Sequence, residues 1–426
     1  MPDGTATAHL LRPKLATTFE EGYGLPKLRL DVMAGLTVAV VALPLSMAIA
    51  VASGVSPERG LYTAIIGGTV VSVLGGSRYQ IGGPAGAFIV LVAATAAKFG
   101  LGGLFCAVFL SGLMLVALGL ARLGGVVRHI PHAVTVGFTC AIATTILASQ
   151  LRDLGGLTLS GPEPGALGPK LLTLVGALRT WQPAAVLIGL AVAAVIFAMK
   201  RLRPTWPGML VAVVAASIAA FAFHLPIVTI GARFGGIPGG LPAPAPPPLS
   251  PALVLAVLPS AISFALLGAV ESLLSAKVAD GMSGRKHRSN MELVAQGVAN
   301  VASSFFGGIC VTGTIARTAT NVRAGAASPV AGVLHAAFLL VFMLVAAPLA
   351  SYVPLAALAG VLLVVCWNMA EKVEFFRLLR NWRTAAVLLT TFGGTLLRDL
   401  TTGIIAGCAL AALFAVFHKA VPEEGD

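Results

Sequence analysis

Long apolar runs separated by short polar breaks fill the chain from residue 32 to residue 418. A transmembrane helix needs about 20 mostly apolar residues, because each residue adds only about 1.5 Å along the helix axis. The candidate spans are 32–52, 60–76, 84–98, 102–121, 130–150, 181–199, 207–223, 252–276, 290–306, 314–325, 329–350, 355–370, 384–397 and 402–418. The pattern therefore predicts an all-α integral membrane protein with 14 transmembrane segments.

The basic residues support this count. With an even number of spans both termini lie on one side, and the predicted loops on that side hold 20 of the 28 Lys and Arg residues. The loops on the other side hold 7, and Arg317 lies inside a span. Because cytoplasmic loops carry an excess of Lys and Arg, we expect both termini in the cytoplasm and the chain in the cell membrane.

A polar segment, residues 224–251, divides the predicted spans into two groups of seven. It contains Pro-Ala-Pro-Ala-Pro-Pro-Pro, which is typical of a stiff, extended linker. Seven is odd, so the second group enters the membrane in inverted orientation, as in many transporters. The expected order is a cytoplasmic N-terminal segment, a first repeat, an external linker, a second repeat and a cytoplasmic tail: 1–30, 31–223, 224–251, 252–419 and 420–426.

Composition and motifs exclude several classes of protein. Hydrophobic residues make up 57% of the chain and charged residues 10%, far from the roughly 25% charged residues of a soluble domain. The net charge of +12 does not indicate nucleic-acid binding, because the basic residues lie in short clusters between apolar runs. We expect no metal, cofactor or enzymatic activity, since the chain shows no ligand spacing, Walker motif or nucleophile with its base.

The third predicted span begins inside the membrane. It runs from Pro84 to Lys98, which is about 22 Å of helix against a hydrocarbon core of about 30 Å. Pro84 suits the first helical position, and the backbone N–H groups of Ala85, Gly86 and Ala87 would then lack partners in lipid. Because a helix N-terminus carries partial positive charge, an anion is the ligand that this arrangement favours.

The equivalent span of the second half has the same character. Thr312 and Thr314 are candidate N-caps, and Arg317 follows within one turn. A charged residue within the membrane marks a transport pathway by default, and here it adds to the positive helix terminus. Short Gly-rich segments also serve close helix packing, but two of them at equivalent places favour a binding site.

Two further positions bear on transport. Glu271 lies near the middle of the span 252–276, either as a structural partner of Arg317 or as a protonatable coupling group, and we favour coupling. Pro44 interrupts the first span, which makes Pro44 and Leu45 candidates for lining the site, although a simple kink explains Pro44 equally well.

Several blocks of sequence together resemble the SulP family of anion transporters, which includes pendrin and prestin. They cover nearly the whole chain: residues 31–44, Gly60-Leu-Tyr62, Gly83-Pro84, Glu271, residues 292–300, Thr312 to Arg317 and residues 399–403. The resemblance implies a 7+7 inverted repeat like that of the uracil permease. Spans 1–4 and 8–11 would form a core domain, and spans 5–7 and 12–14 a gate domain.

The resemblance also implies a function. A small anion would bind between the starts of spans 3 and 10 and cross by an elevator movement of the core against the gate, in a homodimer. By position, Glu271 would face the site, and the lining residues would be Ala85, Gly86, Ala87, Phe88, Thr314, Ile315, Ala316 and Arg317. Proton-coupled symport is the preferred mechanism, with sodium as the other candidate coupling ion.

Two departures from the family pattern stand out. Family members usually carry a C-terminal STAS domain, and this chain stops where that domain would begin. The polar residue usual after the first-span proline is Leu45 here, which leaves an inorganic oxyanion, bicarbonate and a small dicarboxylate open as substrates. An anion exchanger or passive channel is the main alternative, and a nucleobase permease is less favoured because Arg317 lies at the helix start.

Overall fold

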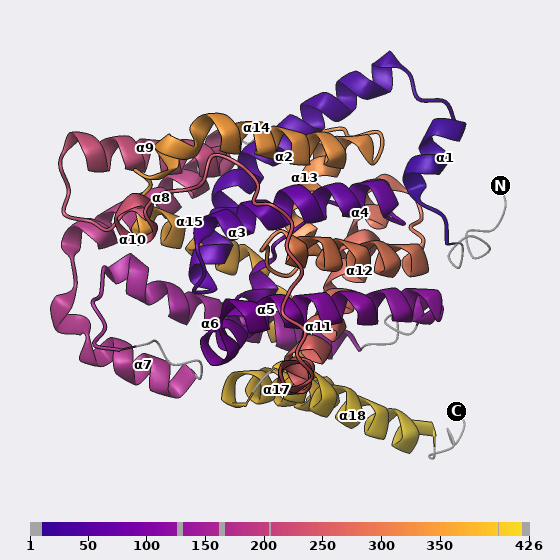
Figure 1. Ribbon diagram of the computed structural model, residues 1–426. Coiled ribbons are helices and arrows are strands. Elements are labelled where there is room, and N and C mark those ends of the chain that lie inside the picture. The colour runs from indigo at the N-terminus through magenta and orange to yellow at the C-terminus, as the bar shows by residue number, and fades with distance from the viewer. Residues whose placement is uncertain (1–10, 126–130, 162–166, 204–205, 399, 420–426) are drawn as a thin grey trace.

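The computed structural model describes residues 11–125, 131–161, 167–203, 206–398 and 400–419, and they are mostly helical (Figure 1). The first ten residues and the expected tail 420–426 lie outside the described residues. The elements of the first half are α1 (Lys14–Glu20), α2 (Leu25–Ala52), α3 (Pro57–Tyr62), the π-helix η1 (Thr63–Gly67), α4 (Gly68–Leu74), β1 (Gly82–Gly83), the 3-10 helix η2 (Gly86–Phe88), α5 (Ile89–Leu120), α6 (His132–Gly155), α7 (Leu167–Gly176), the 3-10 helix η4 (Leu178–Thr180), α8 (Pro183–Leu202), α9 (Gly208–Ala222) and α10 (Ile230–Phe234).

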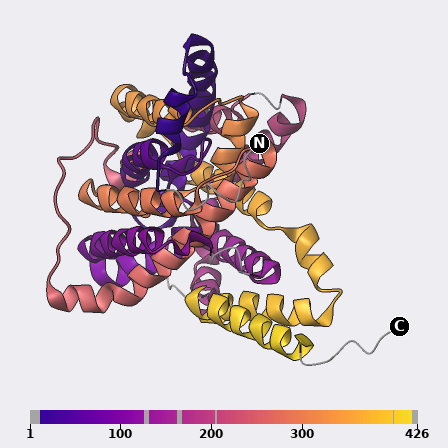
Figure 2. The ribbon, with the colours of Figure 1, turned by 90° about the vertical axis from the view of Figure 1, so that its right-hand side faces the viewer.

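The second half begins with a well-capped helix, because Ser250 accepts a hydrogen bond from the Leu253 amide and Pro251 occupies the first turn. Its elements are α11 (Pro251–Ser283), α12 (Ser289–Phe305), β2 (Thr312–Gly313), α13 (Ile315–Arg323), α14 (Val330–Ala350), α15 (Leu355–Met369), α16 (Lys372–Leu378), α17 (Trp382–Leu397) and α18 (Leu400–Lys419). The Pro-rich segment before α11 has no helix or strand and runs along the outside of the bundle (Figure 2).

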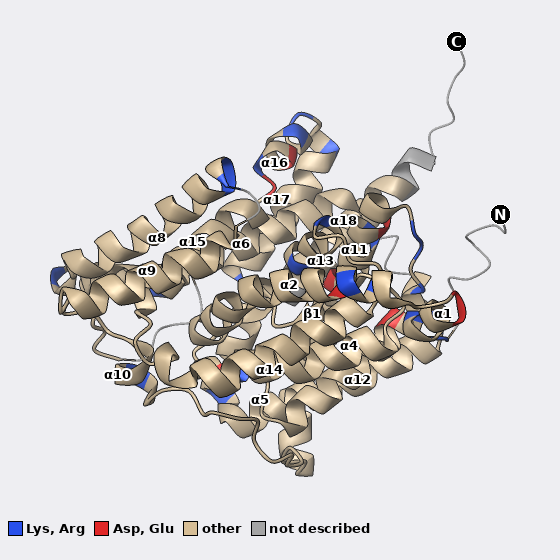
Figure 3. Ribbon diagram, turned by 90° about the horizontal axis from the view of Figure 1, so that it is seen from above, with Lys and Arg blue, Asp and Glu red and all other residues tan. Residues whose placement is uncertain are grey.

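Seven helical segments of the described chain are long and apolar enough to cross a membrane. They are Leu25–Ala52, Gly86–Leu120, His132–Gly155, Pro183–Leu202, Pro251–Ser283, Val330–Ala350 and Leu355–Leu378. Shorter apolar helices include Leu167–Gly176, Gly208–Ala222 and Thr402–Ala415. Most of the ribbon carries no charge, and charged residues form small groups, among them those around α1, α16, α13 and α10 (Figure 3). A mostly helical membrane protein follows, while the count of 14 spans stays a prediction.

The third and fourth predicted spans meet at a kink within α5. The sequence predicts separate spans at 84–98 and 102–121, and α5 consists of two helical stretches that join at Gly100, whose φ of 68° and ψ of −176° are not helical. A glycine adopts positive φ without steric cost, so a single residue is enough to kink the helix.

One short β pair interrupts the mostly helical chain. β1 and β2 form a two-stranded antiparallel pair in which Gly82 lies opposite Gly313 and Gly83 opposite Thr312. Broken helices leave backbone N–H and C=O groups that cost several kcal/mol each in an apolar environment without partners. The two interrupted segments satisfy these groups by pairing with each other, which brings residues from opposite halves of the chain together.

The helices pack in two groups, and each group combines helices from both halves of the chain. Helices α2, α4 and α5 contact chiefly α11, α12, α13 and α14. Helix α6 contacts chiefly α15 and α17, α8 packs on α15 and α9, and α18 packs on α17. The second group extends away from the first in Figures 1 and 2. Contacts of α2 with α9 and α15 join the two groups.

At one end of the first group, buried carboxylates tie the two halves together. Glu292 accepts hydrogen bonds from the amides of Gly76 and Ser77 at 2.9 and 3.0 Å. Asp31 accepts from the Ala327 and Ser328 amides at 2.7 and 3.0 Å. Each carboxylate thus satisfies N–H groups at a turn of the other half, which offsets the cost of its own burial.

Close backbone contact between α5 and α12 leads to a test of stability. A Cβ atom on Gly297 would lie 2.5 Å from the Gly112 carbonyl oxygen, so Gly297→Ala must push the two helices apart. We expect a loss of about 1–3 kcal/mol in unfolding free energy, seen as a lower thermal midpoint in detergent. The control is Gly281→Ala in α11, because nothing lies within 4 Å of a Cβ there. Equal midpoints for both variants would contradict the tight contact.

Candidate functional site

The β1–β2 pair holds the starts of two helical segments close together. Ala85 is the extended residue before η2, and Thr314 is the extended residue before α13. The Thr314 amide donates to the Ile81 carbonyl across the pair at 3.1 Å. The first intrahelical bond of α13 comes from the Thr318 amide, so the N–H groups of the preceding residues point out of the helix start.

The structure corrects two details of the helix starts. Pro84 is not the first helical residue, because it belongs to the extended segment and the helix begins at Gly86. Thr314 is the N-cap by its backbone, but its side chain makes no capping bond, and its hydroxyl is buried without a partner among the described residues. Thr312, the other candidate cap, lies in β2.

The predicted lining residues divide into a buried and an accessible set. Ala85, Ala87 and Phe88 are buried, with exposed fractions of 4% or less. Gly86 is partly exposed, and Ile315 and Ala316 are exposed. The accessible residues therefore lie at the first positions of the two helices, where backbone N–H groups have no partner within the helix. Such N–H groups can bind an anion.

Arg317 is buried between the two halves. Its side chain is 1% exposed, and its Nη2 donates to Ser46 Oγ at 3.1 Å and to the Pro84 carbonyl at 3.3 Å. Its Nε and Nη1 have no hydrogen-bond partner within the described chain. The guanidinium thus lies against β1, close to both helix starts. Its Nε and Nη1 carry N–H groups that no described residue accepts.

Gly83 makes room for the guanidinium. A Cβ atom on this residue would lie 2.2 Å from Arg317 Nη1, and its φ of 159° also disfavours other residues. Ser46, which α2 presents to the same guanidinium, was missed from the sequence. The available signal was its hydroxyl two residues after Pro44, in an otherwise apolar run.

A hydroxyl network on the other side fixes α11 against the β pair. Ser272 Oγ lies 2.8 Å from Thr312 Oγ1, and Ser275 Oγ donates to Thr318 Oγ1 at 3.1 Å. The Gln80 amide group donates to the Ser272 carbonyl at 2.9 Å. Sequence reasoning missed these side chains, because isolated Ser, Thr and Gln residues in spans carry no distinctive spacing.

Glu271 precedes this network directly and is partly buried. In the described part of the chain no ion pair joins it to Arg317, whose contacts are Ser46 and Pro84. Both roles predicted for Glu271, as a partner of Arg317 and as a coupling group, therefore stay predictions.

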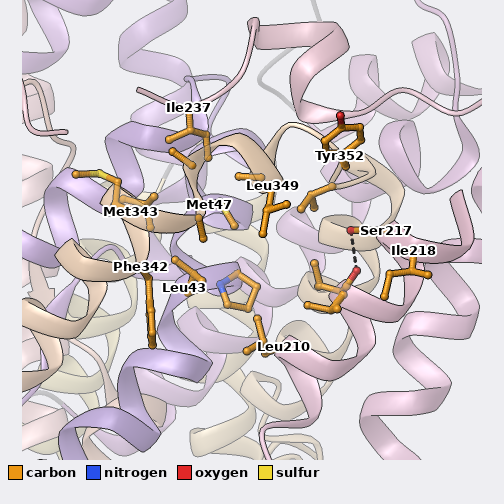
Figure 4. A pocket seen from close by; sticks show the side chains of 18 of the residues that line it. Leu43, Met47, Leu210, Ser217, Ile218, Ile237, Phe342, Met343, Leu349 and Tyr352 are labelled. Carbon is orange, nitrogen blue, oxygen red and sulfur yellow. Dashed lines mark hydrogen bonds between the residues drawn. The ribbon is translucent and has the colours of Figure 1, made fainter. Parts of the chain in front are cut away.

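A separate cavity of about 650 Å³ lies between α2, α9 and α14 and is almost entirely apolar (Figure 4). Pro44 lines it, together with Leu43 and Met47. Figure 4 labels two residues with hydroxyl groups, Ser217 and Tyr352. The Ser217 hydroxyl donates to the Val213 carbonyl of its own helix. No charged residue lines this cavity, so the candidate anion site is the pair of helix starts.

Comparison with known proteins identifies the family. Residues 28–392 match the family model described as the sulfate permease family. YvdB of Bacillus subtilis, named provisionally as a sulfate transporter, is 43% identical over 398 residues, which cover 93% of this chain and 75% of that protein. The bicarbonate transporter BicA of Picosynechococcus is 33% identical over 404 residues, covering 91% of this chain and 70% of BicA.

Solved structures agree. The transmembrane domain of a cyanobacterial BicA superposes with a TM-score of 0.80 at 30% identity, covering 90% of this chain and 98% of that domain. SLC26A9 superposes with a TM-score of 0.86 over 95% of this chain and 68% of that one, and at 21% identity it supports the fold alone. The relatives are transporters rather than enzymes. The chain therefore belongs to the sulfate permease family of membrane anion transporters.

Proposed function

We propose that this protein is a secondary active transporter that carries a small anion across the cell membrane by proton-coupled symport. The observation that carries the proposal is Arg317, a fully buried cation with two unused donor nitrogens and no carboxylate partner among the described residues. Burying an unpaired charge is costly, and such a site is retained where a ligand supplies the opposite charge.

The anion would bind between the two helix starts. Ala85, Gly86, Ala87 and Phe88 would contribute from the first half, and the backbone of the α13 start from the second. The second-half residues are Thr314, Ile315, Ala316 and Arg317. Backbone N–H groups suit an anion whose oxygens accept several bonds, and the charge of Arg317 adds to the partial charges of the two helices.

Glu271 is the proposed coupling group. It lies beside Ser272, whose hydroxyl contacts β2, so protonation would change the charge next to the anion site. A proton on Glu271 would remove the repulsion between a carboxylate and a bound anion, so that the two load together. Sodium, held by the same carboxylate, is the alternative coupling ion, and an exchanger or passive channel would need no such group.

The proposed transport cycle follows from the packing. The fourteen spans would form two inverted repeats of seven, with both ends in the cytoplasm. The core would comprise α2–α5 with α11–α14, and the gate α6, α8, α9, α15, α17 and α18; contacts within each group outnumber those between them. The proposed lining residues all belong to the core, and Ile146 of α6 in the gate packs near Gly86, so movement of the core against the gate would carry the bound anion between the two membrane faces. We also propose that the protein forms a homodimer.

The substrate is proposed as a small inorganic oxyanion, bicarbonate or a small dicarboxylate. YvdB carries the name of a sulfate transporter and BicA that of a bicarbonate transporter, and both align over more than 90% of this chain. A nucleobase is less favoured, because it is neutral and would leave Arg317 without an opposite charge.

Uptake into proteoliposomes tests the proposal. Radiolabelled sulfate, bicarbonate, chloride and succinate are offered with and without an inward proton gradient, and uracil serves as the neutral control. We expect uptake of at least one anion, increased by the gradient, and no uptake of uracil. Gradient-independent anion uptake would favour the exchanger or channel, whereas uracil uptake would overturn the anion assignment.

A further inference from the structure

The apolar cavity described above has no role in the proposed anion site. It has a volume of about 650 Å³ and lies between α2 and α14 on one side and α9 on the other (Figure 4). These helices belong to different groups, since α2 and α14 pack in the proposed core and α9 packs on α8 in the proposed gate. The volume lies within the range of about 300–1,000 Å³ that is typical of pockets for organic ligands.

The lining of the cavity offers water few partners. No charged residue lines it, and the Ser217 hydroxyl already donates to the Val213 carbonyl. A buried water needs about two to four polar partners, and apolar cavities without them stay dry. Because the cost of an empty apolar cavity grows with its volume, this space favours an apolar occupant.

The cavity opens on the outer surface of the helices. Three of the residues that line it, Ile218, Phe221 and Leu349, have exposed fractions of 62%, 65% and 68%. Met47 and Met343 also line it, and they are at most 4% exposed, so they mark its inner part. The surrounding helices are apolar and belong to a membrane protein, so the opening faces the hydrocarbon of the bilayer. The molecules that reach this opening are therefore lipids.

The dimensions of the cavity suit one acyl chain. Its lining on α9 extends from Leu210 to Ala222, which is about 18 Å of helix, and one leaflet of the hydrocarbon core is about 15 Å thick. Aromatic rings gather where α9 ends: the ring centroid of Phe221 lies 5.5 Å from that of Tyr352 and 6.4 Å from that of His224. Aromatic side chains with a polar group are typical of the boundary between membrane and water, so the lipid headgroup belongs at this end.

We propose that the cavity binds one acyl chain of a phospholipid, which enters from the leaflet on the Tyr352 side and extends to Pro44 of α2. Apolar contacts are not directional, so a flexible chain fills the space between core and gate while the two groups move past each other. A rigid side chain in the same space would hold them in one arrangement. Binding of the chain is independent of the proposed function, whereas its effect on transport rests on the proposed movement of the core against the gate.

Photolabelling tests the binding. The protein is reconstituted with phosphatidylcholine that carries a diazirine near the end of one acyl chain, and the labelled residues are identified by mass spectrometry after irradiation. We expect label on Met47 and Met343, which lipid outside the cavity does not reach. Ala346→Trp, which fills the cavity from α14, should reduce this label at least about fivefold, because little free volume then remains, and leave the label on the exposed Leu187 of α8 unchanged. Ser217→Phe, which fills the cavity from α9, repeats the test if Ala346→Trp fails to fold.

The same variants connect the lipid to transport. We expect Ala346→Trp to lower the maximal uptake rate about tenfold with an unchanged apparent KM, because it slows a conformational step and leaves the proposed anion site untouched. Ala215→Trp is the matched control, since Ala215 lies on an exposed part of α9 and is not among the residues that line the cavity. This variant should match the wild type in both label and uptake.

A wild-type protein without label on Met47 and Met343, or equal label in Ala346→Trp, would overturn the lipid site. Label on these residues from a water-soluble diazirine reagent would also overturn it, because the cavity would then hold water. Loss of label with wild-type uptake would overturn the effect on movement alone. If the wild type takes up no anion while the lipid labels the cavity, the proposed function fails and the lipid site stands.

Discussion

Arg317→Ala is expected to lower anion uptake by at least about a hundredfold while the protein stays folded. The guanidinium is the buried positive charge nearest both helix starts, and charge-assisted hydrogen bonds contribute about 1.5–3 kcal/mol each. Losing two of them corresponds to about a hundredfold or more, since each 1.4 kcal/mol is a factor of ten. The measurement is initial uptake in proteoliposomes with matched protein density.

Stability should respond differently from uptake. The Arg317 guanidinium is buried, and among the described residues its hydrogen-bond acceptors are Ser46 Oγ and the Pro84 carbonyl. Removing a charge that is largely uncompensated relieves its desolvation cost, so we expect an unchanged or higher thermal midpoint in detergent. The same reasoning predicts that saturating anion raises the midpoint of the wild type but not of Arg317→Ala.

Arg323→Ala provides the matched control. Arg323 ends the same short helix, but its side chain is exposed. This variant loses one positive charge from α13 without touching the helix starts, so its uptake should stay within about twofold of wild type. Wild-type uptake by a folded Arg317→Ala protein would contradict the site, and equal losses in both variants would point to a general effect of net charge.

The sequence predicts the class of this protein because the membrane imposes strong constraints. Apolar runs of the required length and the excess of basic residues on one side both follow from the cost of placing polar groups in lipid. The same cost identifies Arg317 and the segment near Pro84 as exceptions that need a function. Those exceptions form the proposed anion site, although the helix itself begins two residues later than predicted, at Gly86.

The partners across the site could not be predicted in the same way. The pairing of Gly82 with Gly313 and the contact of Arg317 with Ser46 join residues more than 200 positions apart. No local pattern encodes such contacts, because they arise when two interrupted helices satisfy each other's backbone groups.

Glu271→Gln is expected to abolish the effect of a proton gradient without abolishing anion binding. Gln has nearly the shape of a protonated Glu but neither binds nor releases a proton, so the variant is fixed in the state proposed to accept the anion. Wild-type uptake should rise several-fold with an inward gradient and exceed equilibrium. The variant should give the same uptake with and without the gradient and should only equilibrate its anion.

Glu58→Gln is the control for this experiment, because Glu58 lies at the start of α3 and its carboxylate bonds to Ser56, away from the helix starts. It should keep the full response to the gradient. A sodium gradient applied in place of the proton gradient separates the two candidate coupling ions, since Glu271→Gln would also remove a sodium ligand. If the gradient still drives accumulation through Glu271→Gln, the coupling proton must bind elsewhere, and Glu271 would be left with a structural role beside the Ser272–Thr312 contact. If instead the wild type ignores both gradients, the protein moves its anion by exchange or passive flow, and the partly buried carboxylate would act by tuning the field at the two helix starts.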